Sequence, residues 1–490
     1  MKNKILNLVR DKNLYVITLI VLVFFGMFVK MDFATDTYNV FMNLNMTIIT
    51  HFASCGRFIT AGLLFIVYKL KIGNEVTYIA SYIISILAMT LSVYKLSNLI
   101  KKEVKTTIVP IVLSLICILN IFSIELFMYL EKGVIVASIL FCVMAVEKIV
   151  KYFEEKNKKE LLLAILFMLI AVTCYQGTVA LFIAISLIYV CKHSKKIKEF
   201  IINNIIVAFC YGIPAIINLV TARVFFVNQR VGGEIILKDS IIKVIAGTKN
   251  MLIQTYLLFP KYMYLASFIL VAILIVILAV KKEKNIKLVA KHIFNIIYIV
   301  CGILLATIFP QLLQNTESIW FVARSTYAGA SILGILLIYL FYNFDLKEGI
   351  KKAIIICSII FMVIQLRYFY KVEIDHYILN YNDKIIAKQI GSIIDEYEKN
   401  SGIKVNKICT YEDATISYTY PNVLCTGDIN ITAFFPSWSR VELIEFYTDR
   451  RFERVEKNEK IEEDFSKKDW KYFEQEQIIF DEDTVHICVF

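Results

Sequence analysis

Long apolar runs recur through most of this chain, and they limit it to a small set of folds. A helix needs about 20 mostly apolar residues to cross the hydrocarbon core of a membrane. The apolar runs lie near residues 14–30, 58–70, 76–97, 107–123, 133–150, 161–175, 177–191, 200–221, 262–280, 290–309, 326–343 and 353–370. Each run is continuous rather than alternating, which favours helices over the strands of a barrel. With 58% hydrophobic and only 19% charged residues, the sequence predicts an all-α polytopic membrane domain.

Basic clusters between the apolar runs predict which ends of the helices face the cytoplasm. The clusters lie at residues 101–105, 148–159, 192–198, 281–287 and 347–352, and a basic segment at residues 2–12 precedes the first run. The positive-inside rule places such clusters in the cytoplasm. All of them fall inside if the short run from Phe58 to Leu70 does not cross the membrane. The sequence therefore predicts about eleven transmembrane helices and a cytoplasmic amino terminus.

The sequence divides into two parts at residue 370. Residues 1–370 form the predicted membrane domain, in which residues 31–74 are one outer loop with helices along the membrane interface. In residues 371–490 the apolar density falls, and helical and β-rich patterns alternate. Helical patterns lie at 378–399 and near 440–447 and 464–473, and β-rich runs lie at 405–411, 422–425, around 480 and at 485–490. The tail is therefore predicted to be a small α/β domain on the extracytoplasmic side.

Two carboxylates, Asp32 and Asp36, follow the first apolar run directly. The predicted topology places both on the outer face, beside a long loop that does not cross the membrane. A glycosyl transfer that inverts the sugar needs one carboxylate to take the proton of the acceptor hydroxyl. If the segment is helical, the four-residue spacing places both side chains on one face. Asp36 and Asp32 are therefore the candidate catalytic residues, and the structural alternative is a pair of solvated loop carboxylates.

Candidate cations for a lipid phosphate also lie on the predicted outer side. They are Arg57, Arg223, Arg230, Lys261 and Arg324. An arginine can hold a phosphate through two parallel hydrogen bonds. An arginine at a helix end can equally extend to the membrane interface without binding a ligand. Arg57 and Arg324 are favoured, and Arg324 follows a polar loop that leads directly into an apolar run.

The pair Tyr175 and Gln176 separates two apolar runs at the outer boundary with almost no loop. Polar residues in such a position often line a cavity, although Gly177 equally suits a tight turn between helices. The chain shows no sequence pattern of a zinc protease, a serine hydrolase or a phosphate-binding loop. The first outer loop lacks carboxylates at the spacing of a DxD-like metal site, so no cofactor is expected, and a divalent cation is possible but not indicated. The net charge of +11 comes mostly from the clusters between runs, and no basic domain typical of nucleic-acid binding appears.

Several short motifs together resemble the Gtr-type bacterial glucosyltransferases. They are an acid just after the first membrane helix, an outer loop that ends in Gly56-Arg57, and Tyr175-Gln176 at an outer helix boundary. The outline of the chain is also similar to the wider GT-C class of transferases that use lipid-linked sugars. In that class the first outer loop carries the catalytic acid and juxtamembrane helices. Where many family members carry adjacent acids, this chain has Thr35-Asp36-Thr37.

The resemblance implies a multi-pass glycosyltransferase of a bacterial cytoplasmic membrane. The donor would be a polyprenyl-phosphate hexose, such as undecaprenyl-phosphate glucose, and the acceptor a cell-surface glycan. Asp36 would deprotonate the acceptor hydroxyl while the lipid phosphate departs against an arginine, with inversion of the sugar.

Two other classes of membrane protein remain open. A flippase or transporter of lipid-linked sugars is also polytopic, and it would be expected to carry paired charges within the membrane or inverted repeats. Neither is evident in the sequence. A polymerase or ligase of surface glycans shares the lipid-phosphate site but uses a large loop between helices rather than a tail domain. Similarity of fold alone does not separate these classes.

Overall fold

The structure is a computed structural model that describes residues 11–226, 236–283, 285–312, 314–412, 423–467, 470 and 473–488. It is mostly helical, at 77%. The chain forms two compact units. We call Met1–Val29 with Ile49–Tyr370 the membrane unit, and Lys30–Ile48 with Lys371–Phe490 the tail unit.

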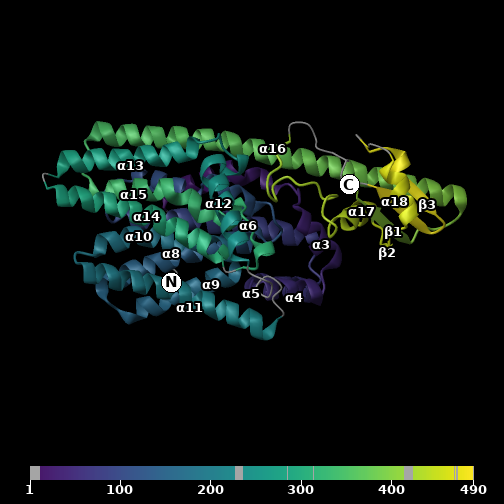
Figure 1. The fold of residues 1–490 in the computed structure, drawn as a ribbon, viewed down its shortest axis with the longest axis horizontal. Helices are drawn as coiled ribbons and strands as arrows, with labels where there is room; N and C mark the ends of the chain where they lie inside the picture. The colour runs from purple at the N-terminus through teal and green to yellow at the C-terminus, as the bar shows by residue number, and fades with distance from the viewer. Residues whose placement is uncertain are drawn as a thin grey trace. The chain divides into compact units, whose positions relative to one another are not determined.

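The membrane unit is built from long helices joined by short turns (Figure 1). Its α-helices are α2 (Lys12–Phe25), most of α4 (Met46–Ser54), α5 (Phe58–Leu70), α6 (Asn74–Lys101), α7 (Ile108–Ile118), α8 (Lys132–Glu155), α9 (Lys158–Cys174), α10 (Ala180–His193), α11 (Ile197–Phe225), α12 (Leu237–Lys249), α13 (Met263–Lys282), α14 (Ile286–Leu312), α15 (Ile332–Asn343) and the first part of α16 (Glu348–Ser401). Short 3-10 or π-helical segments lie between them: η1 (Gly26–Val29), η2 (Ile121–Phe127), η3 (Gln176–Thr178), η4 (Asn250–Gln254), η5 (Thr255–Leu257), η6 (Thr316–Ser318) and η7 (Ala323–Ser331).

Among the described residues, nine helices are long and apolar enough to cross a membrane. The number rises to ten if α7 and η2, which are bent by 63° to each other, form one span. The remaining predicted span is α9, whose 17 residues extend for about 25 Å at the rise of an α-helix. The short apolar run from Phe58 to Leu70, which the predicted topology does not count as a membrane span, forms α5 and has only 13 residues. The protein is thus a multi-pass helical membrane protein, and the number of eleven spans stays a prediction.

Aromatic rings connect the first described helix of the membrane unit to its last. Phe25 of α2 stacks on Phe127 of η2 with ring centroids 3.9 Å apart, and it meets Phe369 of α16 edge to face at 5.5 Å. The Tyr370 hydroxyl donates a hydrogen bond to the Val23 carbonyl over 2.8 Å. Each aromatic pair contributes about 0.5–1.5 kcal/mol beyond the area that it buries. These contacts hold the two ends of the membrane unit together.

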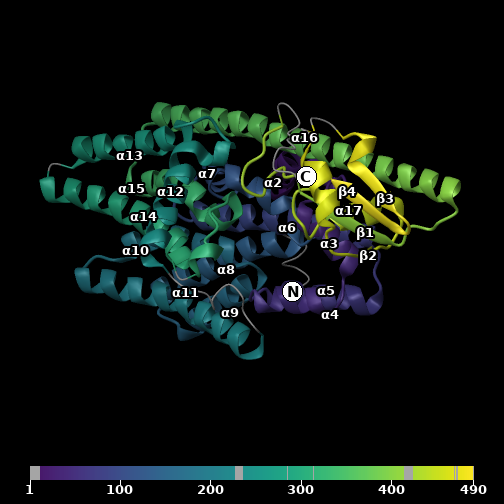
Figure 2. The same cartoon turned by 45° about the vertical axis from the view of Figure 1, so that its right-hand side comes forward.

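The tail unit combines helices with a small four-stranded sheet (Figure 2). Its elements are α3 (Thr35–Asn43), the second part of α16, β1 (Lys407–Tyr411), α17 (Arg440–Thr448), β2 (Glu453–Arg454), α18 (Glu459–Ser466), η8 (Gln475–Gln477), β3 (Ile478–Asp481) and β4 (Thr484–Cys488). The strand order is β2-β1-β4-β3. Strand β1 pairs in parallel with β2 and β4, and β3 pairs antiparallel with β4.

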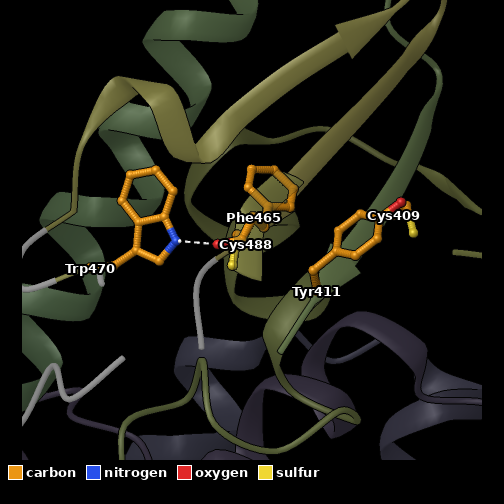
Figure 3. Close-up of a cluster of buried hydrophobic side chains, with 5 residues drawn as sticks. All are labelled: Cys409, Tyr411, Phe465, Trp470 and Cys488. Atoms are coloured by element: carbon orange, nitrogen blue, oxygen red, sulfur yellow. Dashed lines mark hydrogen bonds between the residues drawn. The ribbon is translucent and has the colours of Figure 1, made fainter. Parts of the chain in front are cut away.

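An apolar cluster holds the sheet against its helices (Figure 3). It contains Cys409, Tyr411, Phe465, Trp470 and Cys488, all of which are buried. The Trp470 indole donates a hydrogen bond to the Phe465 carbonyl over 3.1 Å, so the polar edge of the buried ring has a partner. Both cysteines are buried and pack as small apolar side chains.

Residues Lys30–Ile48 belong to the tail unit, whereas the sequence analysis treats residues 31–74 as one loop of the membrane domain. The Phe33 amide donates a hydrogen bond to Asn380 Oδ1 over 2.8 Å. The Tyr38 hydroxyl donates to the same oxygen over 3.2 Å, and burial raises the pKa of Tyr38 well above its ordinary value. Asn380 is more than 300 residues away in the sequence. Contacts between residues so far apart in the sequence assign the segment to the tail unit, and no local sequence pattern predicts them.

Three elements of the tail differ from the sequence-based expectation. The helical pattern at 378–399 is only the end of α16, which runs without a break from Glu348 to Ser401. Residues 423–425 are not a strand, and residue 422 lies outside the described residues. The helix expected near 464–473 begins earlier, at Glu459, because Asn458 accepts a hydrogen bond from the Lys460 amide and caps the helix.

Candidate active site

A cavity of ≈ 500 Å³ lies in the membrane unit. Its walls come from the turn between α4 and α5, the junction of α9 and α10, parts of α11 and α14, and the segment that leads into η7. Its charged and amide side chains are Arg57, Gln176, Asn218, Gln311, Gln314, Glu317 and Arg324. Its apolar side chains include Val172, Val179, Ala215, Leu219, Ala222, Ala306 and Pro310. The cavity therefore suits a ligand that has both a polar and an apolar part.

Two motifs that are far apart in the sequence meet at this cavity. Gln176 Nε2 donates a hydrogen bond to the Cys55 carbonyl over 3.1 Å, across 121 residues of sequence. Asn218 Nδ2 donates to the Gly56 carbonyl over 2.8 Å. Two amide side chains thus hold the turn that presents Arg57 to the cavity.

Gly56 is required in this turn for two reasons. Its φ of +74° is in the left-handed region, which costs other residues about 1–2 kcal/mol. A Cβ atom at this position would also lie 2.3 Å from Asn218 Oδ1 and 2.8 Å from Gln176 Nε2. Both atoms belong to the side chains that hold the turn. Any larger residue at position 56 therefore displaces them.

We expect Gly56→Ala to lower the thermal unfolding temperature of the purified protein and to disturb the cavity. The left-handed backbone and the two close contacts both oppose the added methyl group. Gly62→Ala is the matched control, because Gly62 lies within α5 and a Cβ there meets nothing within 4 Å. Unfolding followed by intrinsic fluorescence in detergent measures both variants. Equal unfolding temperatures for the two would contradict this account of the turn.

Arg57 has hydrogen-bonding capacity left over in the structure. Its Nη1 approaches Glu131 Oε1 at 3.5 Å, which is long for a hydrogen bond. Its Nε is buried and has no hydrogen-bond partner among the described residues. The guanidinium carbon lies 5.0 Å from the centre of the Tyr175 ring, within the range of a cation–π contact. Arg57 is therefore oriented by Tyr175 and still has donors for an anion.

Arg324 is more fully paired within the protein. Its backbone amide donates to Glu125 Oε2 over 2.7 Å, and its Nη1 donates to Glu125 Oε1 and to the Tyr129 hydroxyl. Glu125 is fully buried. A buried carboxylate needs such a partner, because an uncompensated charge in the interior is strongly unfavourable. The first task of Arg324 is therefore to neutralise Glu125.

Tyr175 and Gln176 lie at the cavity wall, where α9 ends and η3 begins. Tyr175 is buried and has extended backbone angles, so the chain leaves α9 there. At Gly177 a Cβ would lie 2.8 Å from the Arg324 carbonyl and 2.6 Å from the Tyr175 ring. Only glycine allows this close approach of the two segments.

The candidate acids lie in the tail unit. Asp36 is in the first turn of α3, where a negative charge is favourable for the helix dipole. It is exposed, and its Oδ1 accepts a hydrogen bond from the Trp438 indole over 2.9 Å. Asp32 precedes the helix, which begins at Thr35, so the two carboxylates do not share a helix face. Ala34, directly before the helix, is extended, and the neighbouring Phe33 is buried.

Arg223, a further predicted cation, does not line the cavity. Arg223 is exposed in the last turn of α11, and Arg230 lies outside the described residues. The sequence analysis missed Asn218, although an amide within the apolar run 200–221 is a known signal of a cavity residue. No group of three potential metal ligands occurs in the part of the chain that the structure describes.

No protein-family model matches this chain, and neither a characterised protein nor a solved structure matches it. The chemistry of the site is therefore argued from its own residues. The cavity can hold an anionic group at Arg57 and an apolar chain along α11 and α14. The exposed carboxylate of Asp36 can accept a proton.

Proposed function

We propose that this protein is a membrane glycosyltransferase that moves a hexose, such as glucose, from a polyprenyl-phosphate carrier to a cell-surface glycan. In this proposal Arg57 holds the phosphate of the carrier, and Asp36 takes the proton of the acceptor hydroxyl. The hydroxyl oxygen forms a bond to the anomeric carbon, and the bond from that carbon to the phosphate oxygen breaks. A single displacement inverts the sugar, and the polyprenyl phosphate leaves.

The observation that carries the proposal is the mixed character of the membrane cavity. A prenyl phosphate consists of an anionic head and an apolar chain. Arg57 offers its unpartnered Nε donor to the head, and helices α11 and α14 offer apolar side chains to the prenyl chain.

The position of the cavity along α14 supports chemistry on the outer face. Ala306 and Gln311 line the cavity near the end of α14. The basic cluster at residues 281–287 lies at the start of the same helix, about 30 Å away at the rise of an α-helix. If that cluster is cytoplasmic, as the positive-inside rule predicts, the cavity belongs to the opposite side. Nucleotide sugars are cytoplasmic, so a lipid-linked donor fits this side.

The test is sugar transfer by the purified full-length protein in lipid nanodiscs. A synthetic polyprenyl-phosphate [¹⁴C]glucose is supplied with extracted cell-wall glycan as acceptor. We expect label in the glycan and free polyprenyl phosphate in equal amounts, and no transfer from UDP-glucose. Transfer from UDP-glucose, or no transfer from a panel of polyprenyl-phosphate hexoses, would contradict the proposal.

A transporter of lipid-linked sugars is the second candidate, because the structure contains a buried charge pair. Arg324 and Glu125 form such a pair in the membrane unit, and buried ionisable pairs are common along transport pathways. Proteoliposomes that contain a fluorescent polyprenyl-phosphate sugar separate the two functions. Movement of the intact lipid across the bilayer, without cleavage of the sugar, would identify a transporter.

A further inference from the structure

The tail unit contains a second cavity, whose lining includes neither Arg57 nor Asp36. Its volume is ≈ 390 Å³, within the range of about 300–1,000 Å³ for small-molecule sites. Residues of α3, the segment before α17, α17 itself and the β2 region form its walls. The side chains that matter here are Asn43, Trp438, Glu442, Glu445, Arg451 and Arg454.

Glu442 leaves one acceptor unused in this cavity. The residue is only 1% exposed. Its Oε1 accepts hydrogen bonds from Asn43 Nδ2, over 2.8 Å, and from Arg454 Nη2. Its Oε2 is buried and has no partner among the described residues. A buried carboxylate oxygen without a donor is unfavourable, so the site favours a ligand that brings a hydroxyl.

The charges of the cavity cancel in pairs. Glu442 is paired with Arg454, and Glu445 with Arg451 at 3.0 Å. Glu445 also accepts a hydrogen bond from the Phe452 amide. A site with no net charge gives little advantage to a phosphate or a cation. The ligand that fits best is therefore neutral and rich in hydroxyl groups.

Trp438 adds an apolar surface to this polar cavity. Its ring is half-exposed, at 51%, although large aromatic side chains are usually buried. The indole nitrogen donates to Asp36 Oδ1 over 2.9 Å, which orients the ring. A sugar ring presents a face of C–H groups and a rim of hydroxyls. An indole face beside carboxylate, amide and guanidinium groups is complementary to both.

We propose that this cavity binds a neutral saccharide and serves as the acceptor subsite of the enzyme. One hydroxyl donates to Glu442 Oε2, other hydroxyls accept from Arg451 and Arg454, and the apolar face of the sugar rests on Trp438. The binding follows from the cavity itself. Its role as acceptor subsite rests on the proposed function, because Trp438 is bonded to the candidate base Asp36.

Calorimetric titration of the full-length protein in detergent tests the binding. The probes are maltotriose and N,N′,N″-triacetylchitotriose, with trigalacturonate as an acidic comparison. We expect saturable binding of at least one neutral probe and at least tenfold weaker binding of trigalacturonate. Trp438→Leu should weaken the binding at least tenfold. Phe435→Leu is the matched control, because Phe435 is also 51% exposed but does not line the cavity.

A second variant checks the unused oxygen. Glu442→Gln keeps the size of the side chain but places an amide where the carboxylate accepts, so the affinity should fall by tenfold or more. If Glu442→Gln fails to fold, the Trp438→Leu variant still tests saccharide binding, because the Trp438 side chain is half-exposed. The absence of saccharide binding overturns the proposal, and so does an equal loss in Phe435→Leu. Binding of a neutral tripeptide in place of the saccharides overturns it as well.

Saccharide binding in this cavity and the proposed transferase function can be refuted independently of each other. If the protein transfers sugar from a lipid donor but binds no saccharide in this cavity, the further inference is wrong and the proposed function stands. If saccharide binding depends on Trp438 but no lipid donor is used, the cavity is a carbohydrate site and the transferase proposal is wrong.

Discussion

Asp36→Asn is expected to abolish measurable sugar transfer while the lipid donor still binds. The amide has nearly the same shape and keeps an oxygen that can accept the Trp438 hydrogen bond. It lacks the basic oxygen that takes the acceptor proton. Loss of general-base assistance typically reduces the rate by about 100- to 10,000-fold. Transfer from polyprenyl-phosphate [¹⁴C]glucose measures the rate, and retention of the donor on the protein measures binding.

Asp32→Asn is the companion variant, and a milder loss is expected for it. Asp32 lies before α3 and does not share a helix face with Asp36. Near-normal turnover in Asp36→Asn together with an inactive Asp32→Asn would reverse the assignment of the base. Normal turnover in both variants would refute the mechanism proposed here.

Arg57→Ala is expected to weaken use of the lipid donor by on the order of 30-fold, equivalent to about 2 kcal/mol. The guanidinium lines the cavity and has an Nε without a partner, so its loss removes donors that a phosphate would use. Arg57→Lys should restore only part of the loss, because an ammonium cannot form two parallel hydrogen bonds. The dependence of the transfer rate on donor concentration measures the effect. Arg367→Ala is the control, because Arg367 is exposed and does not line the cavity.

The structure separates Arg57 from Arg324, which the sequence analysis places in the same role. Arg324→Ala leaves Glu125 buried without its charged partner, so we expect a loss of stability of about 3–5 kcal/mol. The double variant Arg324→Ala/Glu125→Gln should recover much of that stability. If Arg57→Ala keeps normal donor kinetics and Arg324→Ala is stable but has lost the donor, the phosphate ligand is Arg324.

Much of the candidate site can be predicted from single residues in their local context. Gly56-Arg57 and Tyr175-Gln176 stand out because they interrupt apolar sequence at helix ends, and the structure places both motifs at one cavity. Asn218 was missed, although an amide in an apolar run carries the same signal. The pairing of Arg324 with Glu125 was not predictable, because Glu125 is 199 residues away and lies between the apolar runs 107–123 and 133–150.

The sequence by itself determined the class of this protein. Runs of apolar residues exclude a soluble fold, because the free energy of moving apolar surface out of water depends on composition and length. Only the tertiary structure decided where the residues around Asp36 belong. The burial of Phe33 and Tyr38 against Asn380 joins residues 30–48 to the tail unit. Such hydrogen bonds and ring contacts join residues hundreds of positions apart, and their energy depends on geometry that no local pattern encodes.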